Sequence, residues 1–152
     1  MDLSVIVERT LDVGIILSIL TNKEVFDAIS EDTATFNDIH IDVIKDYWLK
    51  ITVENQVIGV VQFKQMFNKC YDSHIHILPW YRKKHSIDSG KEIIKWCKNN
   101  LSGCLLYTNV PVFCENVKRF LISFDFIEQG ILPNAWSKNG VMNDMSIMTR
   151  EV

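Results

Sequence analysis

The stretch "HIHILPWYRKKHSIDSGKEIIKWC", from His74 to Cys97, constrains the fold of this chain more than any other segment. It begins with alternating apolar and polar residues, which is typical of a β-strand with one buried face. A proline and a short basic segment follow, and apolar residues then recur at helical spacing. Ser86 is a favourable helix cap, and Asp88 in the first turn would complement the helix dipole. The sequence therefore predicts a strand, a basic turn and a helix from Ser86 to about Asn100, and several folds bind a phosphate with this arrangement.

Length and composition indicate a single domain, residues 1–152, of which 47% are hydrophobic. The net charge of −3, from 16 basic and 19 acidic residues, argues against a nucleic-acid partner. The first residues do not resemble a secretory signal, and the longest apolar segment, "VGIILSIL", is shorter than the roughly 20 residues that a membrane span needs. We therefore expect a cytoplasmic protein, in a bacterium or an infected host cell, with neither nucleic acid nor a membrane as its partner.

The cysteine pattern argues against a metal site or a redox pair. Cys70, Cys97, Cys104 and Cys114 form no C-x-x-C pair, and both kinds of site need closely spaced sulfur ligands. The four residues are therefore predicted to be reduced, mostly buried thiols.

The order of the other segments predicts a mixed α/β fold. No repeat or linker interrupts the chain. The sequence predicts one sheet of about seven strands, with helices on both faces and two strand-helix-strand crossovers. The predicted elements are a strand at 3–9, two helices over 10–29 divided at Thr21 and Asn22, a hairpin over 46–66 around Asn55-Gln56, a strand at 73–78, the helix from Ser86, a strand at 104–110, a helix after Pro111, and strands at 124–132 and 141–152 separated by a polar loop at 133–140.

Two histidines on the strand at 73–78 are candidate bases. His74 and His76 share one face, because side chains two residues apart on a strand point to the same side. Imidazole titrates near neutral pH, so either residue could accept a proton from a substrate amine. The alternative interpretation is a pair of polar residues that only cover the sheet. The sequence nominates no further metal ligand for this pair, so no metal site is predicted.

The element order and three local segments resemble the GNAT superfamily of N-acetyltransferases over nearly the whole chain. The segments are the hairpin "LKITVENQVIGVVQF", the strand-turn-helix described above, and the crossover "VPVFCENVKRFLISFDFIEQG". The resemblance implies a central strand splayed from its parallel neighbour, with the pantetheine arm of acetyl-CoA in the gap. It also implies that backbone N–H groups of the turn bind the pyrophosphate at a helix N-terminus.

The turn of that family has Arg or Gln, two residues, Gly, one residue, and then Gly or Ala. In "PWYRKKHSI", Arg82 takes the first position, while His85 and Ile87 take the two positions of small residues. Glycine there lets the backbone approach the phosphates, so these side chains oppose donor binding, although the local basic charge attracts anions. The residual acetyl-CoA or phosphate site that the resemblance implies comprises Ile77, Leu78, Arg82, Lys83, Lys84, His85, Ser86 and Ile87.

The helix after the parallel strand departs from the family in the same way. Many members carry an Asn at its start, a Tyr seven residues later as general acid, and a Gly-Phe pair that closes the helix. Counting back from Asp125 and Phe126 places Cys114 at the Asn position and Leu121 at the Tyr position. Leucine cannot donate a proton to a leaving thiolate. The resemblance therefore implies a retained scaffold without the usual catalytic residues.

This chain, in which "HIHILPWYRKK" stands in place of the glycine-rich turn, more closely resembles small acetyltransferase-like proteins of short-tailed bacteriophages. This family includes head assembly proteins. The resemblance implies a head assembly or virion morphogenesis factor that needs no cofactor and contacts phage virion or assembly proteins. The alternative is an active acetyl-CoA-dependent N-acetyltransferase of a protein or small-molecule amine, with His74 or His76 as base. A sensor that binds CoA without turnover is a third hypothesis.

Overall fold

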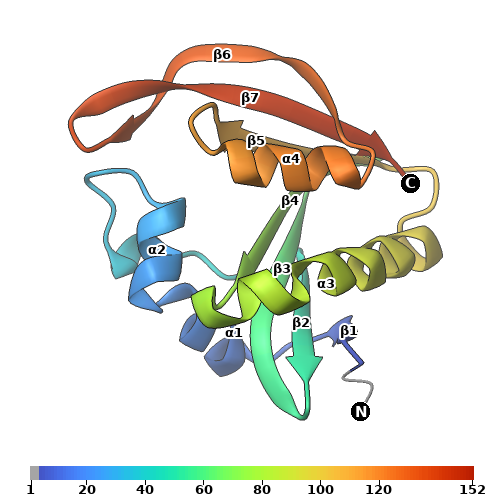
Figure 1. Ribbon diagram of the computed structural model, residues 1–152. Coiled ribbons are helices and arrows are strands. Elements are labelled where there is room, and N and C mark those ends of the chain that lie inside the picture. Colours follow the sequence, from blue (N-terminus) through green and yellow to red (C-terminus); the bar gives the residue numbers. More distant parts are fainter. Residues whose placement is uncertain (1–3) are drawn as a thin grey trace.

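The computed structural model describes residues 4–152 and has the predicted order of helices and strands (Figure 1). Leu3, in the predicted first strand, lies outside the described residues. The elements are β1 (Ile6–Arg9), α1 (Val13–Leu20), α2 (Lys23–Ile29), a 3-10 turn (Phe36–Asp38), β2 (Tyr47–Val53), β3 (Gln56–Phe67), β4 (Cys70–Ile77), α3 (Pro79–Asn100), β5 (Leu105–Pro111), α4 (Glu115–Ser123), β6 (Ile127–Lys138) and β7 (Val141–Glu151).

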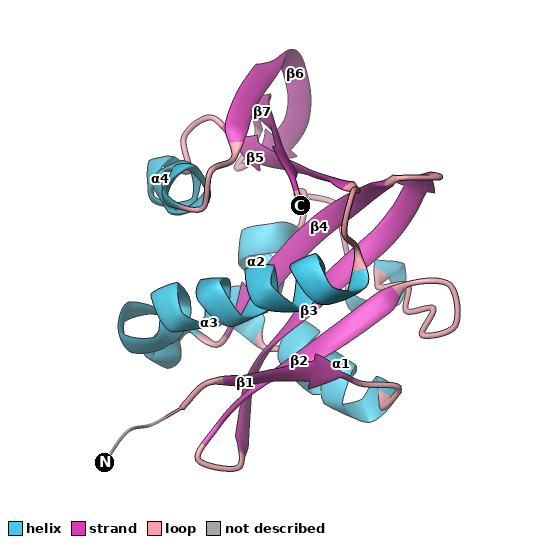
Figure 2. Ribbon diagram, turned by 90° about the vertical axis from the view of Figure 1, so that its right-hand side faces the viewer, coloured by secondary structure: helices cyan, strands magenta, loops and turns pink. Residues whose placement is uncertain are grey.

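The strands form one seven-stranded sheet in the order β1-β2-β3-β4-β5-β7-β6. Every neighbouring pair is antiparallel except β4 and β5, which are parallel. Helix α1 packs on one face, and α3 and α4 cover the other (Figure 2). The expected mixed sheet with helices on both faces is therefore confirmed.

Two apolar layers hold these helices against the sheet. Alternate residues of β2 enter opposite layers, since Trp48 packs with α1 while Leu49 and Ile51 pack with α3 and α4. The segment from Ile58 to Val61 in β3 is buried on both faces, which explains its almost continuous apolar sequence. The centre of the sheet is therefore a rigid support for β4, its neighbour.

Side-chain caps explain why the predicted helical segment at 10–29 divides into two. Asp12 caps α1 by accepting a hydrogen bond from the Ile15 N–H at 3.1 Å. Asn22 caps α2 by accepting one from the Val25 N–H at 3.2 Å. The predicted division at Thr21 and Asn22 is confirmed.

Two predicted connections were wrong in position. The β2–β3 turn is formed by Glu54 and Asn55, with φ values of 49° and 64°, and Gln56 already belongs to β3. Such positive φ values at both central residues are those of a two-residue hairpin turn. The predicted loop at 133–140 is mostly strand, because β6 continues to Lys138 along the sheet edge, where irregular pairing with β7 tolerates Pro133.

A cluster of hydrogen bonds joins the segment after α2 to the β6–β7 turn. The Asp32 carboxylate accepts hydrogen bonds from the N–H groups of Asn139 (2.6 Å) and Gly140 (2.9 Å), and Glu31 accepts one from Ser137 N–H at 2.9 Å. These backbone donors lower the pKa of Asp32. The contacts, which we call the β6–β7 turn clasp, connect the segment after α2 to the β6–β7 hairpin (Figure 1).

Gly59 is required where β3 passes the end of β4. A Cβ atom at this position would lie 2.5 Å from the carbonyl oxygen of His76, so any side chain would push the two strands apart. We expect Gly59→Ala to lower the free energy of unfolding by about 1–3 kcal/mol. Urea denaturation would measure the change. The matched control is Gly130→Ala in β6, where a Cβ would meet nothing within 4 Å. Equal stability of the two variants would contradict the expectation.

Candidate functional site

The candidate site lies where β4 and β5 separate. The two strands pair only from Cys70↔Leu105 to Asp72↔Tyr107, although β4 continues to Ile77 and β5 to Pro111. Beyond these partners each strand stays with its other neighbour, and the sheet opens into the gap visible in Figure 2. The splayed pair that the resemblance implied is therefore present.

Some backbone N–H and C=O groups of β4 point into this gap. Leu78 N–H donates to Ile58 C=O at 2.9 Å, which fixes the alternation along the antiparallel β3–β4 ladder. Residues 74 and 76 consequently bond toward β3, and the N–H and C=O groups of 75 and 77 face β5. Arg82 Nε donates to the Ile77 carbonyl at 2.8 Å. The predicted anion-binding arginine therefore covers one backbone acceptor of the gap.

Three polar side chains of β4, those of Asp72, His74 and His76, share the face that α1 covers. The His74 and His76 rings lie parallel with centroids 6.3 Å apart, so the predicted common face is confirmed. His74 Nε2 lies 2.9 Å from Asp72 Oδ1, although this buried oxygen accepts no hydrogen bond of good geometry. Their side chains are 33% and 22% exposed.

His76 is more deeply buried than His74, and burial changes its ability to bind a proton. His76 is buried, and this desolvation, with smaller contributions from the charges of His74 and Arg82, lowers its pKa to about 3. A ring that stays neutral at every physiological pH cannot carry a proton away from an amine. Of the two predicted bases, only His74 has both the exposure and the acidic partner that a base needs.

A second acidic side chain forms a hydrogen bond with the cross-strand neighbour of His74. Gln62 is the cross-strand partner of His74 in β3, and its amide donates to Asp46 Oδ2 at 2.8 Å. Asp46 is only 8% exposed. Asp72 thus contacts His74 directly, and Asp46 contacts its cross-strand neighbour Gln62.

The predicted basic turn does not exist, because α3 begins at Pro79 and runs without interruption through the basic residues. Proline suits the first helical position, and the segment contains no glycine before Gly90 to open a loop. Inside a helix each N–H donates to the carbonyl four residues earlier, so the N–H groups of residues 83–87 cannot surround a phosphate. Ser86 is therefore an interior residue, and its predicted role as helix cap was wrong.

The side chains of the predicted phosphate site point in different directions along this helix. His85 is 6% exposed and contacts Tyr81, whose hydroxyl donates to Gln56 at 2.7 Å. Ile87 is 52% exposed, so it does not fill the gap. Lys83 and Lys84 are exposed, Ser86 is half-buried, Ile77 closes β4, and Leu78 packs with the α1 layer. The structure brings together only Ile77, Leu78 and Arg82.

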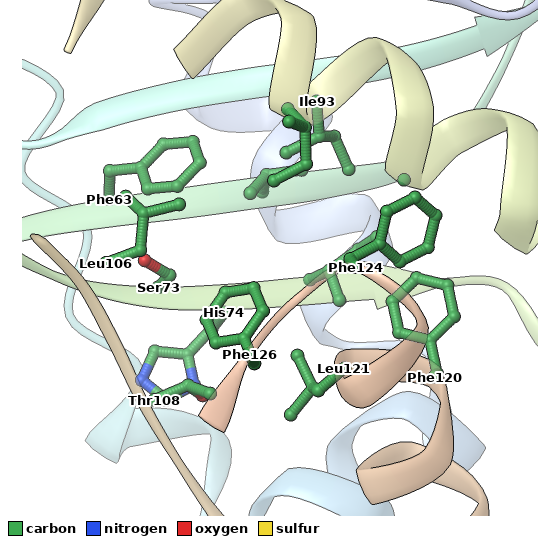
Figure 3. A pocket seen from close by; sticks show the side chains of 14 residues that line it. Phe63, Ser73, His74, Ile93, Leu106, Thr108, Phe120, Leu121, Phe124 and Phe126 are labelled. Carbon is green, nitrogen blue, oxygen red and sulfur yellow. The ribbon is translucent and has the colours of Figure 1, made fainter. Parts of the chain in front are cut away.

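The space between β4, β5, α3 and α4 is small and apolar (Figure 3). Its volume is about 50 Å³, whereas small-molecule sites usually measure about 300–1,000 Å³. Phe120, Phe124 and Phe126 are among the side chains that line it, and the ring of Phe124 lies against Gly90. A pantetheine arm fits only after these rings move.

Helix α4 offers no proton donor to this space. Leu121, at the Tyr position of the family, is buried, and Cys114 precedes the first residue of α4. Partial burial raises the pKa of the Cys114 thiol, which therefore stays protonated. Asp125 has a φ of 63°, which explains why the family prefers glycine here.

Sequence analysis missed Asp72, Asp46 and Phe124. The pattern D-x-H-x-H at 72–76 places Asp72 on the histidine face, so its alternation could have nominated that residue. Neither Asp46 nor Phe124 could be found this way, because strand pairing brings the first to Gln62 and helix packing brings the second to Gly90.

Within residues 4–152 no three His, Cys, Asp or Glu side chains gather as a metal site would require, and the four cysteines are free thiols. Over the same residues, no helix is long and apolar enough to cross a membrane.

The low pKa of His76 makes stability depend on pH. The unfolded chain binds a proton near pH 6.5 and the folded chain near 3, so stability falls as the pH drops through this window. We expect wild type to lose about 1.4 kcal/mol per pH unit more than His76→Gln below pH 6.5. Urea unfolding between pH 7 and 5 would measure this difference. The exposed His40→Gln control should keep the wild-type slope, and a His76 ring that titrates near pH 6.5 by NMR would contradict the expectation.

No protein-family model and no curated protein sequence matches this chain. Solved structures do. A Vibrio cholerae spermidine N-acetyltransferase in complex with CoA and spermine has a TM-score of 0.79 and 17% identity, over 97% of this chain and 95% of that one. A Brucella melitensis ribosomal-protein-alanine N-acetyltransferase has a TM-score of 0.70 and 15% identity, over 97% and 99%. A GNAT-family acetyltransferase from Streptococcus pneumoniae has a TM-score of 0.73 and 11% identity, over 97% and 98%. At such identities the likeness concerns the fold: this chain has the fold of the GNAT N-acetyltransferases.

Proposed function

We propose that this protein is an acetyl-CoA-dependent N-acetyltransferase that acts on a positively charged amine. The observation that carries the proposal is the contact between His74 and Asp72 at the point where β4 leaves β5. A base with an acidic partner thus borders the gap in the sheet. The fold shared with the three acetyltransferases named above supports the same reaction class.

In this proposal His74 accepts the proton of the attacking amine, and Asp72 stabilises the resulting imidazolium. The amine nitrogen forms a bond to the thioester carbonyl carbon, and the carbon–sulfur bond breaks. Because Leu121 cannot protonate the leaving sulfur, the departing thiolate regains a proton from His74 or from water. Asp46 and Asp72 attract the ammonium form of the acceptor before the proton is removed.

The proposal requires side chains to move when the donor binds. The cavity of about 50 Å³ is too small for the pantetheine arm, and Arg82 covers the Ile77 carbonyl. Rotation of Phe120 and Phe124 would enlarge the space without moving the strands, since both rings extend from the end of α4 (Figure 3). The energy needed for this rearrangement lowers the affinity for the donor.

A second candidate is the non-catalytic head assembly factor that the closer resemblance implies. The continuous helix through the basic segment and the filled cavity favour it, because both remove features that a donor needs. The three solved structures named above are all acetyltransferases, and none of their names refers to a phage protein. The acetyltransferase therefore stands as the first proposal.

The acetyltransferase proposal predicts thiol release when acetyl-CoA is mixed with a suitable amine. Spermidine and a peptide with an amino-terminal alanine represent a small-molecule and a protein acceptor. We expect His74→Ala to lower kcat by about 10²–10⁴-fold, because it removes the general base. Asp72→Asn should act more weakly and shift the pH profile. A thiol-reactive dye would follow the reaction.

The control for this experiment is His40→Ala, which removes an exposed histidine far along the sequence from β4 and should leave the rate unchanged. If no amine releases thiol and calorimetry detects no acetyl-CoA binding at millimolar concentration, the acetyltransferase proposal is wrong. The assembly role would then be the better hypothesis.

A further inference from the structure

We propose that Gln62 of β3 binds the acceptor nitrogen, and that Asp46 holds the Gln62 carboxamide in the orientation that this contact requires. The proposal rests on the acetyltransferase function proposed above and adds a substrate contact outside β4. Gln62 is the cross-strand partner of His74. Side chains of such partners extend from the same face of a sheet, with Cβ atoms about 4.5–5.5 Å apart. One small group can therefore contact Gln62 and His74 together.

The hydrogen bond to Asp46 fixes which way the Gln62 carboxamide points. Gln62 Nε2 donates to Asp46 Oδ2 at 2.8 Å, and a carboxylate can only accept hydrogen bonds. The NH₂ group must therefore face Asp46, which leaves Oε1 directed away from it. Asp46 is buried, so little water competes for this contact. Asp46 thus acts through Gln62 as a positioning residue and does not itself touch the amine.

The carboxamide oxygen of Gln62 is an unused hydrogen-bond acceptor on the same face as the proposed base. Within the described part of the chain, the bond to Asp46 is the only one that the Gln62 side chain makes. Gln62 is half-buried, and its Oε1 is not among the enclosed polar atoms that lack a partner. This oxygen is therefore accessible to solvent, and a ligand that donates an N–H can bind it.

A primary ammonium group has enough hydrogens for both contacts. His74 accepts one proton before the nitrogen attacks the thioester carbon and later returns it to the leaving thiolate, while a second proton leaves to water as the amide forms. The third hydrogen stays on the nitrogen and remains donated to Gln62 Oε1. Because this bond is present before and during the attack, it contributes to binding more than to the rate of the chemical step. A secondary amine keeps no hydrogen for Gln62, so the contact favours primary amines.

Steady-state kinetics of the full-length Gln62→Leu variant test the contact. The substrate is spermidine or the peptide with an amino-terminal alanine, whichever releases thiol faster. We expect KM for the amine to rise about tenfold while kcat changes less than threefold, because one hydrogen bond to a charged donor is lost. The same amine trimethylated at the reacting nitrogen has no N–H to donate, so it should inhibit wild type and Gln62→Leu equally.

Exchange of the two side chains separates substrate binding from a purely structural role. Asp46→Asn alone should raise KM about threefold, because an amide can both donate and accept and no longer fixes the orientation of Gln62. When Asp46→Asn is combined with Gln62→Glu, the new amide donates to the new carboxylate, and one carboxylate oxygen stays free. This double variant should bind the amine at least as well as wild type. The two variants keep the test valid if Gln62→Leu does not fold.

The matched control is Gln65→Leu, the same change at an exposed position on the opposite face of β3, which should leave KM unchanged. An unchanged KM in both Gln62→Leu and Asp46→Asn would overturn the inference while the proposed function stands. An equal rise in Gln65→Leu, or tighter inhibition of wild type than of Gln62→Leu by the trimethylated amine, would overturn it as well. If wild type releases no thiol from either amine, the proposed function fails and this inference fails with it.

Discussion

The short parallel pairing of β4 with β5 is the constraint on which the rest of the structure depends. The two strands stay together only from Cys70 to Asp72, because β4 then follows β3 while β5 follows β7. On the face covered by α3 and α4, Phe120, Phe124 and Phe126 line the small cavity beside the opening. The β6–β7 turn clasp connects the segment after α2 to the β6–β7 hairpin on the other half of the sheet. The gap is therefore a stable feature between two well-packed halves.

The two histidines of β4 differ in how deeply they are buried, and this difference decides which of them can bind a proton. His74 and His76 are the same residue type on the same face, yet only His76 lies deep enough for desolvation to keep it neutral. His74, which is one-third exposed, contacts Asp72 and is the cross-strand partner of Gln62, which bonds to the buried Asp46. Position along β4 thus assigns a structural role to one histidine and leaves the other available for proton transfer.

The early start of α3 removes the backbone N–H groups that could bind an anion. A glycine-rich turn would present backbone N–H groups, whereas a helix that starts at Pro79 uses them internally. Arg82, the one residue retained from the family pattern, bonds to the end of β4. Lys83 and Lys84 stay exposed beside it, and Lys91, Lys95 and Lys98 are exposed farther along the helix.

The sequence by itself determined the order of the elements, the mixed sheet and the shared face of the two histidines. Each depends on local periodicity, on caps such as Asp12 and Asn22, or on alternation along a strand. It also showed that Leu121 cannot serve as an acid. Tertiary structure decided which side chains of α3 are held against the sheet, since the Tyr81 hydroxyl donates to Gln56 of β3. It alone brought Asp46 to Gln62 and Phe124 to Gly90, since these partners lie far apart in the chain and only the folded backbone sets their distance.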